Sequence, residues 1–381
     1  MTAVNKALNV LAVRDRYNSA FNTPRLSRHA ITRRRFVPFN LIYQPLAGAT
    51  LVNPWPPQHF DLLHAFNRVP LGPTPYVIGF ESHLPRVFGR EESRVAQALR
   101  RELASDRCRA IVPMSEIAKK IFLDQHKDAP ELEALRAKIV VRFPNVIVPP
   151  DLTDWFDPAA PLNELRVMFV GGDFARKGGC VAVKVAERAK AAGAPIHFTI
   201  ISSLNVGAKV YTDPSNPAFF EPYFKLLEQD NINFMRGAPN SEVLEIASKS
   251  HLQLLPTFAD TFGYSAIEAM ARFCPTLATK QGALPEFLND ENAVMLPLET
   301  DHLNGWVHNS SPLRAAPAFE KIFADEVERM ADQTFAACLD LLNNPRKLAA
   351  LRAAGRRTVE QKFDARDAGK FWDDLYMKAV N

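Results

Sequence analysis

Residues 252–272 read LQLLPTFADTFGYSAIEAMAR, in the order of a strand, a polar loop and a helix. The apolar run 252–256 has the length of a buried strand, and helical spacing begins near Tyr264. The loop between them carries Asp260 and Gly263. Apolar strands that alternate with helices are typical of parallel sheets covered on both faces. The stretch therefore predicts an α/β fold.

The same alternation runs through the chain in two series. The first series has expected strands at 8–13, 60–66, 76–80, 109–113 and 138–143, with helices at 90–105 and 115–125. The second has expected strands at 166–170, 196–202, 233–235, 252–256, 276–279 and 293–296, with helices at 179–192, 222–230, 240–250, 264–272 and 284–289. The chain ends in expected helices at 320–342, 345–362 and 365–379.

A segment rich in Pro and Asp, 148–163, separates the two series and is the best candidate for a domain boundary. We expect two Rossmann-like, doubly wound domains that face each other across a cleft. The first covers residues 1–155, with a C-terminal helix at 365–381 that packs back on it, and the second covers 156–364. Because ligands bind beyond the carboxyl ends of such strands, the site is expected in the cleft.

Composition narrows the classes of protein. The 381 residues are 47% hydrophobic and 23% charged, with a net charge of +4 and a mean hydropathy of −0.14. These values are typical of a globular protein and do not favour a nucleic-acid binder. We see no apolar run of membrane-spanning length and no signal peptide. The four cysteines have no paired spacing, so we expect reduced thiols in a cytoplasmic protein.

Several familiar motifs are absent from the sequence. The glycines that follow strand 166–170 match neither GxGxxG nor GxxxxGK[ST], and Ile267 breaks a GxSxG motif. No two aspartates lie two positions apart, and no histidine spacing fits a metal site. We therefore expect neither a metal nor another cofactor.

A glycine-rich stretch at 170–179, VGGDFARKGG, follows one expected strand and opens a helix. Glycines let a ligand approach the backbone, and a helix start favours anions. Arg176 and Lys177 add positive charge, which suits a diphosphate held without metal. The alternative is a tight turn before a solvated basic helix start.

Asp260 and Glu268 form the second constellation. The two carboxylates lie eight residues apart across the junction between loop and helix, where they can line one pocket and bind hydroxyl-rich ligands. Ordinary surface acids are the alternative, and the basic loop about 85 residues earlier weighs against it.

These stretches resemble the C-terminal domain of retaining GT-B glycosyltransferases of family four, the glycosyl transferases group 1. The family signature contains EGFGxxxxEAMA, then GxPVVAT, then GGxPE. This chain has DTFGYSAIEAMA at 260–271, FCPTLAT at 273–279 and GALPE at 282–286. The pair Lys177–Gly178 and the closing helices also match, so the resemblance covers roughly residues 164–370. It implies the GT-B architecture.

The resemblance also implies roles for individual residues. Lys177, with Arg176 beside it, would neutralise the leaving diphosphate, Asp260 would contact the transferred sugar and Glu268 would bind the ribose. The resemblance also places seven further residues at the donor, some through their backbone amides and some around the base. They are Gly172, Ser202, Arg236, Phe262, Gly263, Tyr264 and Ser265. The chemistry implied is hexosyl transfer from a nucleoside diphosphate sugar to a hydroxyl acceptor, such as a cell-surface or lipid-linked glycan, with retention.

Two features belong to the acceptor-side domain. His83 follows a strand, where the family places a histidine near the transferred sugar, and a structural hydrogen-bonding role is the alternative; Glu81 is its neighbour. His64 is expected inside the fold. The segment 24–36, PRLSRHAITRRRF, carries five arginines and could touch an anionic membrane at its inner face or an acidic glycan. The alternative there is a solvated basic loop.

Four of the departures from the family pattern bear on the proposed activity. Asp260 stands for Glu, Gly172 stands where many members have Arg, and Phe273 and Ala283 each replace a glycine. These changes leave two alternatives open. One is a catalytically inactive nucleotide-sugar-binding protein, and the other is an epimerase or phosphorylase of the same fold. The sequence leaves the donor base, the sugar and the oligomeric state open.

Overall fold

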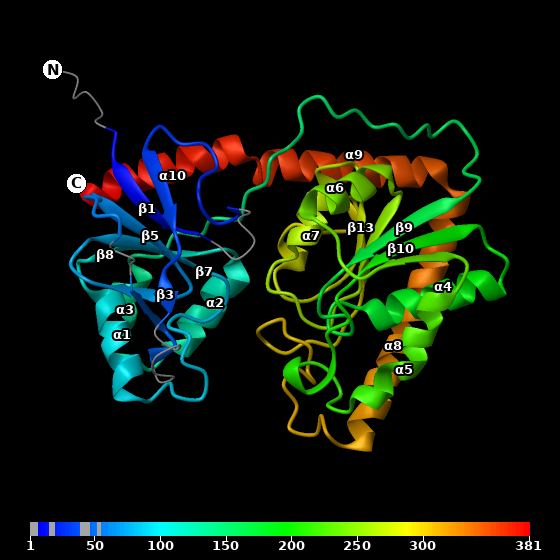
Figure 1. Cartoon of the computed structure of the whole chain (residues 1–381), viewed down its shortest axis with the longest axis horizontal. Coiled ribbons are helices and arrows are strands. Elements are labelled where there is room, and N and C mark those ends of the chain that lie inside the picture. Colours follow the sequence, from blue (N-terminus) through cyan, green and yellow to red (C-terminus); the bar gives the residue numbers. More distant parts are fainter. Residues whose placement is uncertain (1–6, 15–19, 39–45, 52–54) are drawn as a thin grey trace. The chain divides into compact units, whose positions relative to one another are not determined.

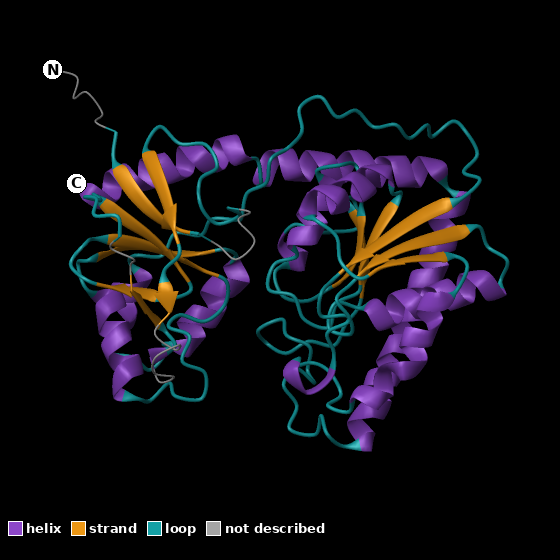
Figure 2. Ribbon diagram, viewed as in Figure 1, coloured by secondary structure: helices purple, strands orange, loops and turns teal. Residues whose placement is uncertain are grey.

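The computed structural model describes residues 7–14, 20–38, 46–51 and 55–381, and divides them between two compact units. Unit 1 comprises Met1–Ile147 and Lys362–Asn381, and unit 2 comprises Val148–Gln361. Each unit contains a parallel sheet with helices on both faces (Figures 1 and 2). The expected α/β class with two doubly wound sheets is confirmed, whereas the cleft between them stays a prediction.

Unit 1 is built on a five-stranded parallel sheet in the order β2-β1-β5-β7-β8. A three-stranded sheet, β3-β4-β6, lies beside it. The strands are β1 (Asn9–Val13), β2 (Ala30–Arg34), β3 (Val37–Pro38), β4 (Ala49–Leu51), β5 (Leu62–Phe66), β6 (Val69–Leu71), β7 (Tyr76–Phe80) and β8 (Cys108–Pro113). The helices are α1 (Arg94–Ala104), α2 (Glu116–Gln125), α3 (Leu132–Arg136) and α10 (Ala365–Val380).

The C-terminal helix α10 covers one face of the unit 1 sheet (Figure 1). Its buried side chains Trp372 and Tyr376 pack on Val10 and Val77 of the strands. His64, expected in the interior, is fully buried under this helix, with its Nδ1 2.7 Å from the Tyr376 hydroxyl. Burial of these large apolar surfaces is what joins the last residues of the chain to the first unit.

Unit 2 contains a six-stranded parallel sheet in the order β11-β10-β9-β12-β13-β14. Its strands are β9 (Leu165–Val170), β10 (Ile196–Ile201), β11 (Ile232–Met235), β12 (Leu252–Leu255), β13 (Thr276–Thr279) and β14 (Ala293–Leu296). Its helices are α4 (Gly179–Ala191), α5 (Glu221–Lys225), α6 (Asn240–Lys249), α7 (Tyr264–Met270), α8 (Pro317–Asn343) and α9 (Pro345–Lys362). A large core lies between the strands and helices α4 and α8, and α6 and α7 pack on the other face.

A buried arginine holds the start of unit 2, around Asp154 and Trp155, against the rest of that unit. Arg352, fully inaccessible to solvent, donates to both carboxylate oxygens of Asp154 and lies 4.8 Å from the ring centre of Trp155. The Trp155 indole also covers Arg166, at 4.8 Å. Because one partner alone would leave a buried charge, this pair ties the segment firmly to strand β9 and helix α9.

Four sequence expectations were wrong at the level of elements. No strand forms at 138–143, where a single bridge joins Ile139 to Ile111. The expected helix 284–289 is one 3-10 turn, Leu284–Glu286, and 222–230 splits into α5 and a 3-10 turn. The basic segment 24–36, for which a loop was the alternative, contains edge strand β2.

The four cysteines are free and buried, as expected. Within the described ranges, no helix combines the length and the apolar character needed to cross a bilayer.

Candidate active site

The strand order of unit 2 places two of the expected motifs together. Numbered along the chain, the order is 3-2-1-4-5-6, and the direction of winding reverses between β9 and β12. Ligands of doubly wound sheets bind beyond the carboxyl ends of the strands at this reversal. The loop after β9 carries Arg176 and Lys177, and the loop after β12 carries Asp260. The two motifs therefore meet at the position where the fold favours a ligand.

Lys177 and Asp260 form an ion pair across this junction, with Nζ 2.5 Å from Oδ2. The other carboxylate oxygen accepts hydrogen bonds from the backbone amides of Phe262 (3.3 Å) and Gly263 (3.1 Å). Burial opposes ionisation of Asp260, but the attraction of Lys177 outweighs it and lowers the pKa of this carboxyl. Burial also lowers the pKa of Lys177. An ionised Asp260 thus holds both the lysine and the turn that starts α7.

Arg176 braces the same two loops. Its Nε and Nη2 donate to one carboxylate oxygen of Asp173, at 3.0 and 2.7 Å, and its Nη1 donates to the carbonyl of Ala259, at 2.8 Å. Asp173 in turn accepts a long contact from Asn205, in the loop after β10. The guanidinium is therefore fixed beside Lys177 before any ligand binds.

Glycines allow the close approach of these loops. Gly178, the N-cap of α4, has φ +93°, and a Cβ there would lie 2.3 Å from the carbonyl oxygen of Pro256. Gly263, the N-cap of α7, has φ +92°. Gly172 has open space around it, with Ser203 and Asn205 at 3.9 Å. The first two positions require glycine because left-handed backbone and crowding coincide there.

Glu268 lies one turn into α7, on a half-buried face beside the fully buried Ile267. Its carboxylate accepts a hydrogen bond of 3.1 Å from Asn240, at the start of α6. Phe262 is buried and stacks on Phe287, and its amide is engaged by Asp260, so its contribution is to shape the turn. Tyr264 and Ser265 are half-buried in the first turn of α7.

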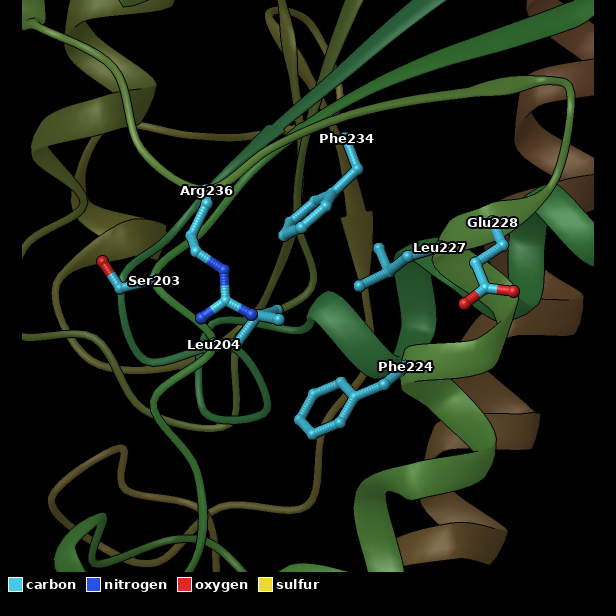
Figure 3. A pocket seen from close by; sticks show the side chains of 7 residues that line it. All are labelled: Ser203, Leu204, Phe224, Leu227, Glu228, Phe234 and Arg236. Atoms are coloured by element: carbon cyan, nitrogen blue, oxygen red, sulfur yellow. The ribbon is translucent and has the colours of Figure 1, made fainter.

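A pocket of about 420 Å³ lies near the carboxyl ends of β10 and β11 (Figure 3). Its lining combines apolar side chains with polar and charged ones. The apolar residues are Leu204, Phe224, Leu227 and Phe234, and the others are Ser203, Glu228 and Arg236. Both Arg236 and Ser202 were expected near the base. Arg236 lines the pocket, whereas Ser202 does not. The Ser202 side chain is buried, donates to the carbonyl of Gly171 and accepts from the amide of Leu204. The next residue, Ser203, occupies the wall instead.

Tyr211 lies beside Arg176, and no sequence motif indicates it. Its ring centre lies 5.9 Å from the guanidinium carbon of Arg176, and its side chain is exposed. The loop that carries it is held from inside: buried Asp213 accepts from the amide of Gly207, and Arg314 donates to the Asp213 carbonyl. Burial raises the pKa of Asp213 to about 7. Since Arg314 is 101 residues away and belongs to no motif, only the fold reveals this contact.

His83 belongs to unit 1, in the loop that follows β7. Burial, and then the charge of Arg86, lowers its pKa, so the neutral imidazole is favoured at neutral pH. The side chain of Phe88 lies edge-on to it at 5.2 Å. Glu81 is turned toward Arg86 and Asn67. The approach of His83 to a transferred sugar stays a prediction.

We compared the chain with known families and with curated proteins. Residues 153–334 match the family model described as glycosyl transferases group 1. Among curated proteins, none matches the sequence significantly.

Solved structures resemble the whole chain. A glycosyltransferase from Rickettsia africae ESF-5 aligns over 99% of both chains, with a TM-score of 0.58 and 14% identity. HepE from Anabaena in complex with UDP-glucose aligns over 97% of this chain and 99% of its own, with a TM-score of 0.58 and 10% identity. Sucrose-phosphate synthase from Thermosynechococcus elongatus aligns over 84% and 74%, with a TM-score of 0.50 and 16% identity. At these identities the likeness shows the fold, which confirms the GT-B architecture.

Proposed function

We propose that this chain is a glycosyltransferase that uses a nucleoside diphosphate sugar and retains the anomeric configuration. The match of residues 153–334 to the model of the glycosyl transferases group 1 supports the class of reaction. The acceptor is a hydroxyl group, and no metal ion is needed. The observation that carries the proposal is the pair Lys177 and Asp260, set with Arg176 at the winding reversal of a Rossmann-like sheet. Fixed cations there can stabilise charge that develops on a leaving diphosphate.

In this proposal the residues of unit 2 divide the donor between them. Lys177 and Arg176 bind the diphosphate, Asp260 contacts hydroxyls of the sugar and Glu268 binds the ribose. The pocket of Phe234 and Arg236 receives the base. HepE of Anabaena is solved with UDP-glucose, so UDP-glucose is the first donor to test.

The proposed reaction takes place on one face of the sugar. The bond from the anomeric carbon to the β-phosphate oxygen breaks, and the acceptor oxygen forms its bond from the same side. The acceptor proton passes to the departing phosphate. Asp260 is engaged by Lys177 and two amides, so it is placed as a binding group and not as a nucleophile. Catalysis then rests on orientation and on stabilisation of the leaving group. His83 is the proposed contact from unit 1.

The test follows the anomer of the product by proton NMR. UDP-glucose, GDP-mannose and ADP-glucose are each incubated with the chain in EDTA with water as the acceptor, and the released sugar is read before it mutarotates. We expect one donor to react and an α-linked donor to give an α product. Lys177→Met should lower the rate about 100-fold or more, whereas Lys190→Met, which removes an exposed ion pair in the same unit, should not. A β product contradicts retention, and dependence on added metal contradicts the cation-based mechanism.

A catalytically inactive sugar-nucleotide-binding protein is the second candidate. It is favoured by Asp260, which is one methylene shorter than the signature Glu and already engaged by Lys177. Donor binding without any turnover, together with turnover in Asp260→Glu, would establish this alternative.

A further inference from the structure

Unit 1 carries two arginines, Arg68 and Arg86, near the carboxyl ends of neighbouring strands. The sheet order β2-β1-β5-β7-β8 reverses its winding between β1 and β5. Arg68 lies two residues after the end of β5, and Arg86 lies in the loop after β7. This edge of a doubly wound sheet is where ligands bind, so the two guanidiniums occupy a favoured position.

One turn of chain holds both arginines in place. The Nε of Arg68 donates to the carbonyl of Ala47, at 3.1 Å. The next residue, Gly48, packs against the two neighbours of Arg86: a Cβ on it would lie 2.9 Å from Pro85 and 3.2 Å from Val87. The two arginines therefore belong to one packed cluster.

The loop that carries Arg86 is fixed from the other side by α2. Gln125 accepts from the amide of Leu84 at 3.0 Å and donates to the carbonyl of Pro85 at 3.1 Å. The Nε2 of His126 lies 2.8 Å from the carbonyl of Leu84. Because these contacts involve backbone groups, the position of the loop does not depend on a ligand.

The charges of this cluster do not balance. Glu81 pairs with Arg86 and also accepts from Asn67, at 3.2 Å. Arg68 has no carboxylate partner among the residues that the structure describes. Burial, and then the charge of Arg86, lowers the pKa of Arg68. Two guanidiniums share one carboxylate, which leaves one positive charge that an anion would offset.

We propose that Arg68 and Arg86 bind an oxyanion, a phosphate or a carboxylate, carried by the acceptor that receives the hexosyl group. Within the described part of the chain, the guanidinium of Arg68 is hydrogen-bonded only through its Nε, and its planar end suits two-point binding of such a group. That the oxyanion belongs to the acceptor rests on the proposed function, but binding of the oxyanion itself does not. The acceptor is therefore an acidic or phosphorylated glycan or lipid, and a neutral sugar binds weakly.

The test is calorimetry on the full chain, saturated with UDP so that the donor site cannot take up a phosphate. Three probes are titrated: glucose 6-phosphate, glucuronate and glucose. We expect the phosphate or the carboxylate probe to bind at least tenfold more tightly than glucose. Arg68→Gln should lower that affinity at least tenfold, and Arg68→Lys should restore part of it. Arg90→Gln, an exposed arginine of the same region, should leave it unchanged. Circular dichroism melts confirm that the variants fold.

The outcomes of this titration distinguish failure of the oxyanion site from failure of the proposed donor site. If UDP binds but glucose binds as tightly as both charged probes, or if Arg68→Gln binds them as well as the wild type, the oxyanion site is refuted and the donor site stands. If UDP does not bind, the titration is repeated with Lys177→Met to remove the second anion site. Binding of the charged probes that still depends on Arg68 then supports the oxyanion site and counts against the proposed donor. Preference for phosphate or for carboxylate identifies the class of acceptor.

Discussion

Phe273 is a residue with a Cβ whose backbone adopts the left-handed conformation. Its φ is 59°, in the left-handed region that glycine adopts readily, and it lies three residues after the end of helix α7. The guanidinium of Arg356 lies 5.0 Å from the centre of its ring. The cation–π contact offsets part of the cost of the left-handed backbone, which is about 1 kcal/mol or more for a residue with a Cβ.

Replacement of Phe273 separates these two effects. Phe273→Ala and Phe273→Gly both remove the ring, but only the glycine relieves the left-handed backbone. We expect the glycine variant to be more stable than the alanine variant by about 1 kcal/mol. Urea unfolding of the two proteins measures this difference. An alanine variant as stable as the glycine variant would contradict the left-handed conformation.

The ion pair of Lys177 and Asp260 gives a second prediction. The Asp260 side chain is 8% exposed, so Asp260→Asn leaves a largely buried lysine without its counter-charge. We expect a loss of about 3 kcal/mol in the free energy of unfolding. The matched control, Asp230→Asn, removes an exposed partner of Lys190 and should cause no measurable change. Equal effects of the two changes in urea unfolding would show that the buried pair does not hold the loops.

The sequence predicted the residues of this pair but not all of their partners. Lys177 and Asp260 were both recognisable because each lies in a loop after an apolar strand, at a position of the family signature. Tyr211 and Asp173 were missed, since their roles come from contacts with Arg176 that only the folded loops create. Ser202 lies next to the pocket without lining it, because strand β10 ends at Ile201 and the serine hydroxyl turns back to Gly171.

At the scale of elements, the buried strands of unit 2 were predictable because they are short apolar runs between helices. The predictions failed for segments whose secondary structure depends on tertiary contacts. The segment 138–143 has the composition of a strand, but only Ile139 bridges to β8. Strand β2 is rich in arginine and resembles a loop, yet its backbone pairs along the whole of β1. An edge strand needs less apolar surface than a central one, and charge there also limits association with other chains.

The loop between β10 and α5 provides a prediction at this scale. Its anchor, formed by Asp213 and Arg314, holds Tyr211 over Arg176. We expect Tyr211→Ala to weaken donor affinity about tenfold, by loss of a contact that orients the guanidinium, and Tyr211→Phe to retain most of it. Calorimetry with the nucleotide gives the affinity. Unchanged binding by the alanine variant would remove Tyr211 from the donor site.

The packing of α10 on β5 predicts a dependence of stability on pH. Burial, and then the charge of Arg33, lowers the pKa of His64 to about 3. The unfolded chain takes up this proton near pH 6.5 and the folded chain does not, so stability falls as the pH drops from 6.5 toward 3. Between pH 6.5 and 5 the loss is about 2 kcal/mol.

His64→Gln should flatten this dependence, and the exposed His197→Gln is the matched control. Urea unfolding at pH 7 and pH 5 compares the three proteins. A His64→Gln variant that loses as much stability as the wild type would contradict a neutral buried imidazole.

At the scale of the whole molecule, the alternation of strands and helices was sufficient to predict two doubly wound sheets. The order of the strands was not, because spacing along the chain does not specify which strands are neighbours. That order matters for function: it places the winding reversal of unit 2 between β9 and β12, beside Lys177 and Asp260, and that of unit 1 beside β5. The C-terminal helix packs on unit 1 through Trp372 and Tyr376.

Titration of the full chain with UDP, GDP, ADP and TDP by calorimetry, with and without EDTA, tests the central claim most directly. We predict that one nucleotide binds with the same affinity in EDTA, that Lys177→Met and Glu268→Gln abolish binding, and that Lys190→Met does not. The absence of binding by all four nucleotides, or full binding by Lys177→Met, would contradict a donor site at the reversal between β9 and β12.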